Sequence, residues 1–162
     1  MRKLAFLALL LLNFSACKKD DPTFLFAVDE VTVSQSSADK NRLKTDIEFV
    51  SIAYADLYGG SIDQGMLEDI IITYKSFGDK SMVIEMIIRK FIDDETSNIG
   101  SIDRNNQTSI ENFVQKTYEK LYNRTPNAFE KWYLSDLIET ETDINAEMVY
   151  FAMMTANEYR YY

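Results

Sequence analysis

The stretch that decides the fold reads FVSIAYADLY and covers residues 49–58. Its apolar residues recur at intervals of three and four, which is the spacing of one face of an α-helix. The chain repeats the pattern 64 positions later as FVQKTYEKLY, residues 113–122. The copies share Phe, Val, Leu and two Tyr at matching positions. We therefore predict two similar helical units, with chance likeness between amphipathic helices as the alternative.

Three helices are expected in each unit. In the first unit, residues 39–58 form a helix that ends at Gly59 and Gly60. Ser61, with Gln64 three positions later, predicts the start of a second helix, and Asp79 predicts the start of a third near residue 80. The expected buried stripes of these two helices are Met66, Leu67, Ile70, Ile71 and Tyr74, then Met82, Val83, Met86, Ile87 and Phe91.

The second unit should have helices near residues 108–122, 126–139 and 144–159. Thr125 and Asp143 stand 64 positions after Ser61 and Asp79, so the predicted helix starts recur as well. Pro126 suits a first helical position because the N–H it lacks has no partner there. The prediction is an all-α bundle of about six helices over residues 39–162, with units near 39–92 and 108–162 and a polar loop at 93–107.

An extended segment is expected before the bundle. Residues 23–33 are rich in aromatic and β-branched side chains, which favours a strand, yet the sequence offers this strand no partner. The segment either packs along the helices or pairs with an edge of another protein through Phe24, Phe26 and Val28.

Composition narrows the classes of function. The net charge of -9 disfavours binding to nucleic acid, which needs clustered Lys and Arg. The absence of histidine excludes Ser-His-Asp and Cys-His catalytic sets. The single cysteine excludes an internal disulfide, so packing of a sequence that is 46% hydrophobic must stabilise the fold.

Residues 1–16 have the features of a signal peptide: Arg2 and Lys3, an apolar run at 4–12, and small residues leading to Cys17. This leader resembles the lipobox of bacterial lipoproteins. The resemblance implies that Cys17 becomes the first mature residue and carries diacylglycerol and palmitate, with no other cofactor expected. Two or three acyl chains anchor a protein firmly, at about 0.8 kcal/mol for each buried methylene.

Residues 17–38 then form a lipidated tether and the extended segment. Lys19, Asp20 and Asp21 resemble the export tag of surface lipoproteins in Bacteroidetes-type bacteria. The resemblance implies an outer-membrane protein displayed on the cell surface, with the periplasmic face as the alternative.

The second unit resembles a helical module of unknown function that is repeated in bacterial extracellular proteins. The likeness covers about fifty residues and implies a fold and a surface setting. It is carried by Phe113-Val114, Tyr118, Leu121-Tyr122, Arg124-Thr125-Pro126-Asn127, Trp132-Tyr133 and Asn157-Glu158-Tyr159.

Two groups of polar residues are candidate sites. Residues 93–103 place oxygen ligands around Gly100, but Ile99 and Asn106 stand where an EF-hand needs ligands, so a solvated acidic loop is favoured over calcium binding. Asp136, Glu139 and Glu141 could line a cleft or form a solvated helix face. Arg124 is expected to bond the preceding helix end or Glu130.

The aromatic residues Tyr159, Tyr161 and Tyr162, with Trp132 and Tyr133 nearby, allow three interpretations: packing, a protein interface or stacking on sugar rings. The favoured function is a non-catalytic accessory or scaffold subunit of an outer-membrane protein assembly for nutrient uptake or secretion. A surface glycan-binding module is the first alternative, and a hydrolase that uses two carboxylates is the second.

Overall fold

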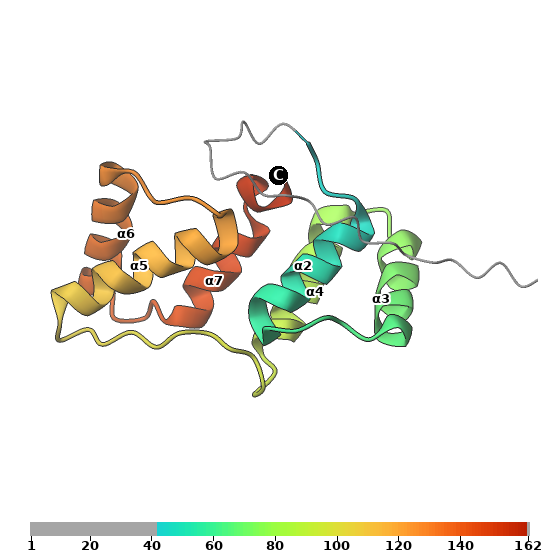
Figure 1. Cartoon of the computed structure of the whole chain (residues 1–162), viewed down its shortest axis with the longest axis horizontal. Helices are drawn as coiled ribbons and strands as arrows, with labels where there is room; N and C mark the ends of the chain where they lie inside the picture. The colour runs from blue at the N-terminus through green and yellow to red at the C-terminus, as the bar shows by residue number, and fades with distance from the viewer. Residues whose placement is uncertain (1–41, 162) are drawn as a thin grey trace, which may run out of the picture. The chain divides into compact units, whose positions relative to one another are not determined.

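Six α-helices and one short 3-10 helix make up residues 42–161, the part of the chain that this computed structural model describes (Figure 1). No strand occurs within these residues, so the predicted all-α fold of about six helices is confirmed. The predictions for Cys17, Lys19, Asp20, Asp21, Phe24, Phe26, Val28 and Tyr162 lie outside the described residues. The elements are α2 (Asp46–Tyr58), α3 (Gln64–Ser76), α4 (Lys80–Ile92), α5 (Gln107–Tyr122), α6 (Ala128–Thr140), α7 (Ala146–Thr155) and η1 (Asn157–Arg160).

Helix α2 begins at Asp46 and not at the predicted residue 39. Thr45 caps the helix, because its hydroxyl accepts from the Glu48 N–H while the Glu48 carboxylate accepts from the Thr45 N–H. Just before this cap, Leu43 forms an antiparallel bridge with Tyr161, and the Lys44 N–H donates to the Arg160 carbonyl. The extended backbone at this bridge prevents an earlier helix start.

The caps of the middle helices also differ from the prediction. Asp63 and Asn127 cap α3 and α6, where the sequence suggested Ser61 and Thr125. The carboxylate of Asp63 accepts from two N–H groups of the first turn, which a serine two residues earlier could not reach. Pro126 therefore precedes the cap and is not the first helical residue.

In the third helices, Asp79 caps α4 as predicted, whereas α7 is capped by Asn145 and not by Asp143. The loop before α7 has five residues, 141–145, against three before α4, 77–79. Helix α7 also ends at Thr155, short of the predicted residue 159, and the chain continues into η1.

Most buried positions of the first unit have a buried counterpart in the second. Buried residues of α2 match those of α5 at an offset of 64 positions in the sequence, and those of α3 match α6 at the same offset. For α4 and α7 the offset is 66, because the loop before α7 is two residues longer than the loop before α4. The left-handed residues that follow α2 and α5, Gly59 and Asn123, keep the offset too. The buried pairs are 49/113, 50/114, 53/117, 57/121, 71/135, 74/138, 83/149, 84/150, 87/153 and 88/154. Ten buried positions thus match between the two sets of three helices.

Three methionines expected in the core are exposed instead. Met66 in α3 is 47% exposed, and Met82 and Met86 in α4 are 43% and 54% exposed. Helix α4 turns the pairs 83/84, 87/88 and 91/92 inward, so its buried face is rotated by one residue from the expected stripe.

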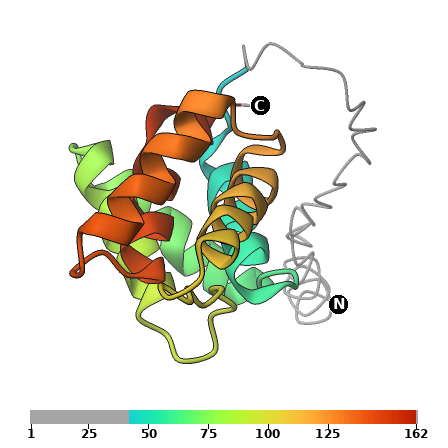
Figure 2. The same cartoon turned by 90° about the vertical axis from the view of Figure 1, so that its left-hand side faces the viewer.

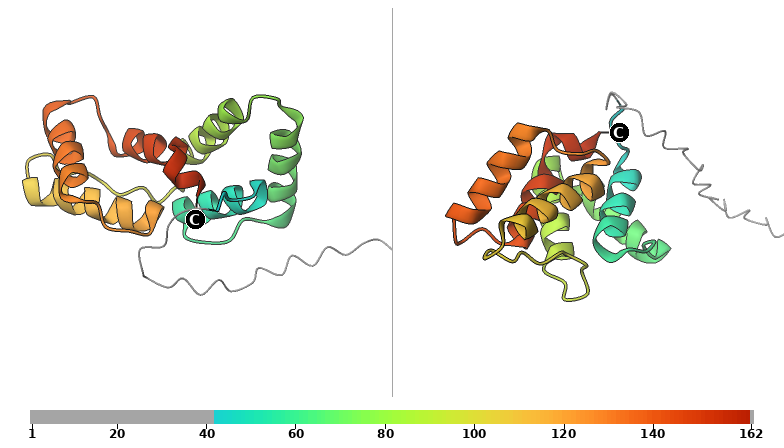
Figure 3. Two further views of the ribbon diagram at one scale, coloured as in Figure 1. Left: turned by 90° about the horizontal axis from the view of Figure 1, so that it is seen from above. Right: turned by 60° about the vertical axis from the view of Figure 1, so that its left-hand side comes forward.

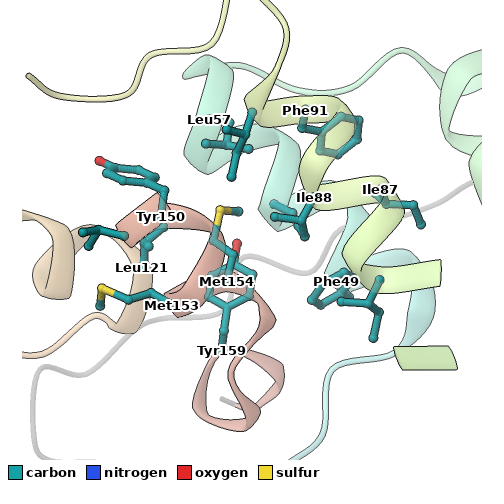
Figure 4. Packing of buried hydrophobic residues seen from close by; sticks show 14 of the residues in the cluster. Phe49, Leu57, Ile87, Ile88, Phe91, Leu121, Tyr150, Met153, Met154 and Tyr159 are labelled. Atoms are coloured by element: carbon teal, nitrogen blue, oxygen red, sulfur yellow. The ribbon is translucent and has the colours of Figure 1, made fainter. Parts of the chain in front are cut away.

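The two units meet at α4 and α7, which lie side by side between them (Figure 3). Buried side chains from α2, α4, α5, α7 and η1 gather in one cluster at this junction (Figure 4). Tyr159 of η1 completes the cluster: its ring packs edge-on against Phe49 at a centroid distance of 5.8 Å, and its hydroxyl donates to Asp56 at 2.7 Å. The described part of the chain contains no helix that is long and apolar enough to cross a bilayer.

Candidate functional site

Of the three interpretations of the aromatic residues near the chain end, the structure supports packing for Tyr159. Tyr159 is fully buried, so the prediction that it binds a partner is corrected in favour of packing. Its ring fills the core against Phe49, and its hydroxyl bonds a carboxylate there. Tyr161 is 38% exposed, and its backbone is held in the bridge to Leu43.

An exposed aromatic surface lies instead on α6. Phe129, Trp132 and Tyr133 are 67%, 60% and 52% exposed, and we call these three residues the aromatic face. The Phe129 ring stacks on that of Tyr133 and is tilted against that of Trp132, with centroid distances of 5.9 Å for both pairs. Figure 2 looks onto the second unit and shows α6 toward the viewer, with no described helix in front of it.

The fold itself does not need these rings. At the equivalent positions of α3 the first unit has Gly65, Glu68 and Asp69, all exposed, although α3 turns the matching residues inward. One three-helix unit is therefore built without aromatic residues at these places. Large apolar side chains that remain exposed and do not serve packing are typical of interaction sites.

A groove of about 310 Å³ runs beside the aromatic face, between α5 and α6. Glu111 on one side is joined to Lys131 on the other at 3.1 Å. The buried hydroxyl of Ser135 lies in this groove and has no hydrogen-bond partner within the described residues. The groove is lined by Gln107, Glu111, Ala128, Lys131, Trp132, Ser135, Asp136 and Glu139.

The groove brings together two of the three carboxylates suggested by the sequence. Asp136 and Glu139 line it, and Glu141 does not. The backbone carbonyls of Ile138 and Glu141 accept from the Arg104 guanidinium, which holds the end of α6 to the loop before α5. The groove thus combines an indole ring, carboxylates, an amide and a hydroxyl, a set suited to holding a polar ligand against an aromatic surface.

Arg124 fixes the start of α6, and with it the aromatic face. Its guanidinium bonds both carboxylate oxygens of Glu130 at 2.8 Å and both of Glu158 at 2.6 and 2.8 Å. These bonds hold the pKa of the Glu130 carboxyl below its usual value and raise that of the guanidinium. The pairing with Glu130 was predicted and is confirmed, whereas Glu158 was missed.

The acidic loop uses its side chains for local turns. Asp94 accepts from the Thr96 N–H and hydroxyl, and Asp103 accepts from the Asn105 N–H. Residues 42–161 contain no cluster of three potential metal ligands from His, Cys, Asp and Glu.

Sequence reasoning noted Trp132 and Tyr133 but missed Phe129, the residue that joins their rings. A signal was present, because positions 129, 132 and 133 share one side of a helix whose opposite side carries Ser135 and Ile138. The chain matches no family model, no curated protein and no solved structure.

Proposed function

We propose that this protein is a non-catalytic accessory subunit of an outer-membrane assembly, held at the membrane by lipid on Cys17, and that the aromatic face of α6 binds its protein partner. The observation that carries the proposal is the exposure of three adjoining aromatic rings that the equivalent helix of the first unit lacks. The predicted leader and the tag Lys19-Asp20-Asp21 supply the setting.

The chemistry of the face suits a protein interface. Trp and Tyr are enriched among the residues that contribute most to protein association, because they bury a large area and lose little conformational entropy. Charged side chains surround the rings: Lys131 with its partner Glu111, and Asp136 on the next turn. An aromatic centre with a charged rim is the usual composition of such surfaces.

The test is co-purification from gently solubilised membranes. The substitution Trp132→Ala should remove the partner protein, at a cost of about 2 kcal/mol or more in binding free energy. Helicity should stay unchanged, because the side chain is 60% exposed. The matched control is Ile72→Ala on α3, where a side chain 64% exposed is shortened in the first unit. Undiminished partner recovery with the Trp132 variant would refute this use of the face.

Anchoring and the extended segment are tested separately. Cys17→Ser should release the protein from the membrane fraction, and an unmodified Cys17 in the mature protein would end the proposal of a lipid anchor. Deletion of residues 23–33 should weaken the partner complex without loss of helicity. Association that survives this deletion would leave the aromatic face as the binding element and exclude strand pairing.

Glycan binding is a second candidate, favoured by the groove beside Trp132. A sugar ring stacked on the indole would lie beside the carboxylates of Asp136 and Glu139, which also line the groove. Glycan-array binding by a monomer, lost in both Trp132→Ala and Asp136→Asn, supports this function over a protein interface. A stoichiometric protein partner with no array signal supports the first.

A further inference from the structure

A second recess lies in the same unit, between α5, Tyr150 of α7 and the loop that precedes α5. Its volume of about 580 Å³ falls within the range of small-molecule sites. Phe113 and Tyr150, both largely buried, contribute aromatic surface, and hydroxyl and amide groups such as those of Ser101 and Asn112 form much of the rest. None of these residues belongs to the aromatic face or to the groove beside it.

The charge of the recess is opposite to that of the protein. The chain has a net charge of -9, yet the lining of the recess includes Lys116 and Lys120 and no acidic residue. Lys120 donates to the Asn98 carbonyl at 3.0 Å, which fixes its ammonium at the wall. Lys116 is exposed, and its ammonium makes no hydrogen bond or ion pair within the described residues. Lys120 also interacts with the Asp56 carboxylate, which does not line the recess, so Lys116 contributes most of the charge that attracts an anion.

The repeat indicates what shape of molecule the recess accepts. On α2, the face that corresponds to the recess wall of α5 is covered by the Tyr159 ring. The ring packs against Phe49, Lys44 lies 4.1 Å from the ring centroid, and the hydroxyl donates to Asp56. On α5, the equivalents of Phe49 and Asp56 are Phe113 and Lys120, and both line the recess. Thr108 also lines it, but it lies within α5, whereas Lys44 precedes α2. The recess lies over these positions of α5, beside the Tyr150 ring, whose centroid is 6.3 Å from that of Phe113 and 5.3 Å from the Lys120 ammonium.

One substitution between the units changes the chemistry at this place. Asp56 accepts a hydrogen bond from the Tyr159 hydroxyl, whereas its equivalent Lys120 is a donor. A ring bound in the recess must therefore offer an acceptor at that end, and with Lys116 one turn away a carboxylate fits best. The hydroxyl and amide walls match the hydroxyls of a sugar.

We propose that this recess binds an acidic sugar, with its ring against Phe113 and its carboxylate between Lys116 and Lys120. The site uses residues separate from those of the proposed protein interface, so either can fail without the other.

The experiment measures binding of D-glucuronate, D-glucose and benzoate to the full-length protein by saturation-transfer NMR and calorimetry. Glucuronate should bind about tenfold or more tightly than glucose, because the ion pairs are charge-assisted. Lys116→Glu should weaken glucuronate binding by about tenfold or more, and raised salt should weaken it too. The matched control is Lys90→Glu, the same charge change at an exposed position of α4 outside the recess.

The control variant and Trp132→Ala should bind glucuronate as the unaltered protein does. Equal affinity for glucose and glucuronate, an unchanged affinity in Lys116→Glu, or no saturable binding of glucuronate would each overturn the proposal. Binding of benzoate without glucuronate would overturn the assignment to a sugar and leave an aromatic acid as the ligand class.

Discussion

At the scale of single residues, Arg124 joins the end of α5 to the start of α6 and to η1 through two bidentate bonds. Its side chain is 34% exposed, so solvent screens these pairs in part. We expect Arg124→Met to lower the free energy of unfolding by about 1–2 kcal/mol in urea titrations. Arg42→Met is the control, because Arg42 forms an exposed pair with Glu48 and should cost about 0.5 kcal/mol or less.

The cost of Arg124→Met should depend on pH. The bonds from Arg124 lower the folded-state pKa of Glu130 below its ordinary value of 4.5. A lowered carboxyl pKa contributes stability above pH 4.5 that is lost as the pH falls through the folded pKa. The difference in unfolding free energy between the unaltered protein and Arg124→Met should therefore become smaller in acid. A difference that stays constant from neutral pH to acid would contradict this role of the Glu130 charge.

The charge of Asp56 should have the opposite effect on stability from that of Glu130. Burial raises its pKa above the ordinary 3.8, although the Tyr159 hydroxyl, Lys44 and Lys120 partly oppose the shift. A raised carboxyl pKa lowers stability as the pH rises from 3.8 through the folded pKa. Asp56→Asn keeps an acceptor for Tyr159 and removes the buried charge, so it should stabilise the protein at neutral pH.

The gain from Asp56→Asn should vanish in acid, as measured by thermal unfolding at several pH values. Asp94 provides the control, because bonds from Thr96 lower its pKa and Asp94→Asn should bring no gain at neutral pH. A loss of stability in Asp56→Asn at every pH would show that the Tyr159 bond requires the charge.

Contacts between residues were predictable from the sequence only where the two residues lie close together along the chain. Arg124 and Glu130 are six positions apart, with a proline turn between them that places them together. Glu158 is 34 positions from Arg124, and Tyr159 is 103 positions from Asp56, so only the packing of distant helices brings them close. The aromatic face lay within one helix and was partly predicted; the recess combines three segments and was missed.

At the scale of elements, α2 and α5 end in the same way. Gly59 has a φ of 73° and Asn123 a φ of 52°, and these are the described residues in the left-handed region. A side chain at Gly59 would meet no neighbouring atom, so only backbone conformation opposes it. We expect Gly59→Ala and Asn123→Ala each to cost about 1 kcal/mol in urea titrations.

Asn123→Gly is the matched control, because glycine adopts this conformation without strain and should leave stability equal or higher. The alanine substitutions would contradict the argument if they were harmless while Gly60→Ala, next in the chain, was costly.

Helix number and order were predictable because apolar spacing and glycines mark them, whereas exact starts were not. Several residues near each start carry side chains able to cap, and backbone geometry decides between Ser61 and Asp63 or between Asp143 and Asn145. The inward face of α4 was misjudged because methionine and isoleucine are both apolar, and only the neighbouring helix α7 distinguishes them.

At the scale of the whole molecule, the two units share one core and should unfold together. Tyr159→Ala removes the fully buried ring of η1 that packs against Phe49 of α2 and should cost about 3–5 kcal/mol. Circular dichroism and tryptophan fluorescence, which reports Trp132 in the second unit, should show coincident transitions. Tyr161→Ala, at a position 38% exposed, is the control and should cost little. Separate transitions by the two probes would mean that the units are independent.

The place of Tyr159 in the chain also has a consequence for biosynthesis. The hydroxyl bond of Tyr159 to Asp56 spans 103 positions, so α2 leaves the ribosome long before the ring that completes its packing. At ordinary rates of translation this interval lasts about 5–20 s. During that time the hydrophobic core of the first unit is incomplete. For a precursor with the predicted leader, the nascent polypeptide therefore remains able to pass through a secretion channel.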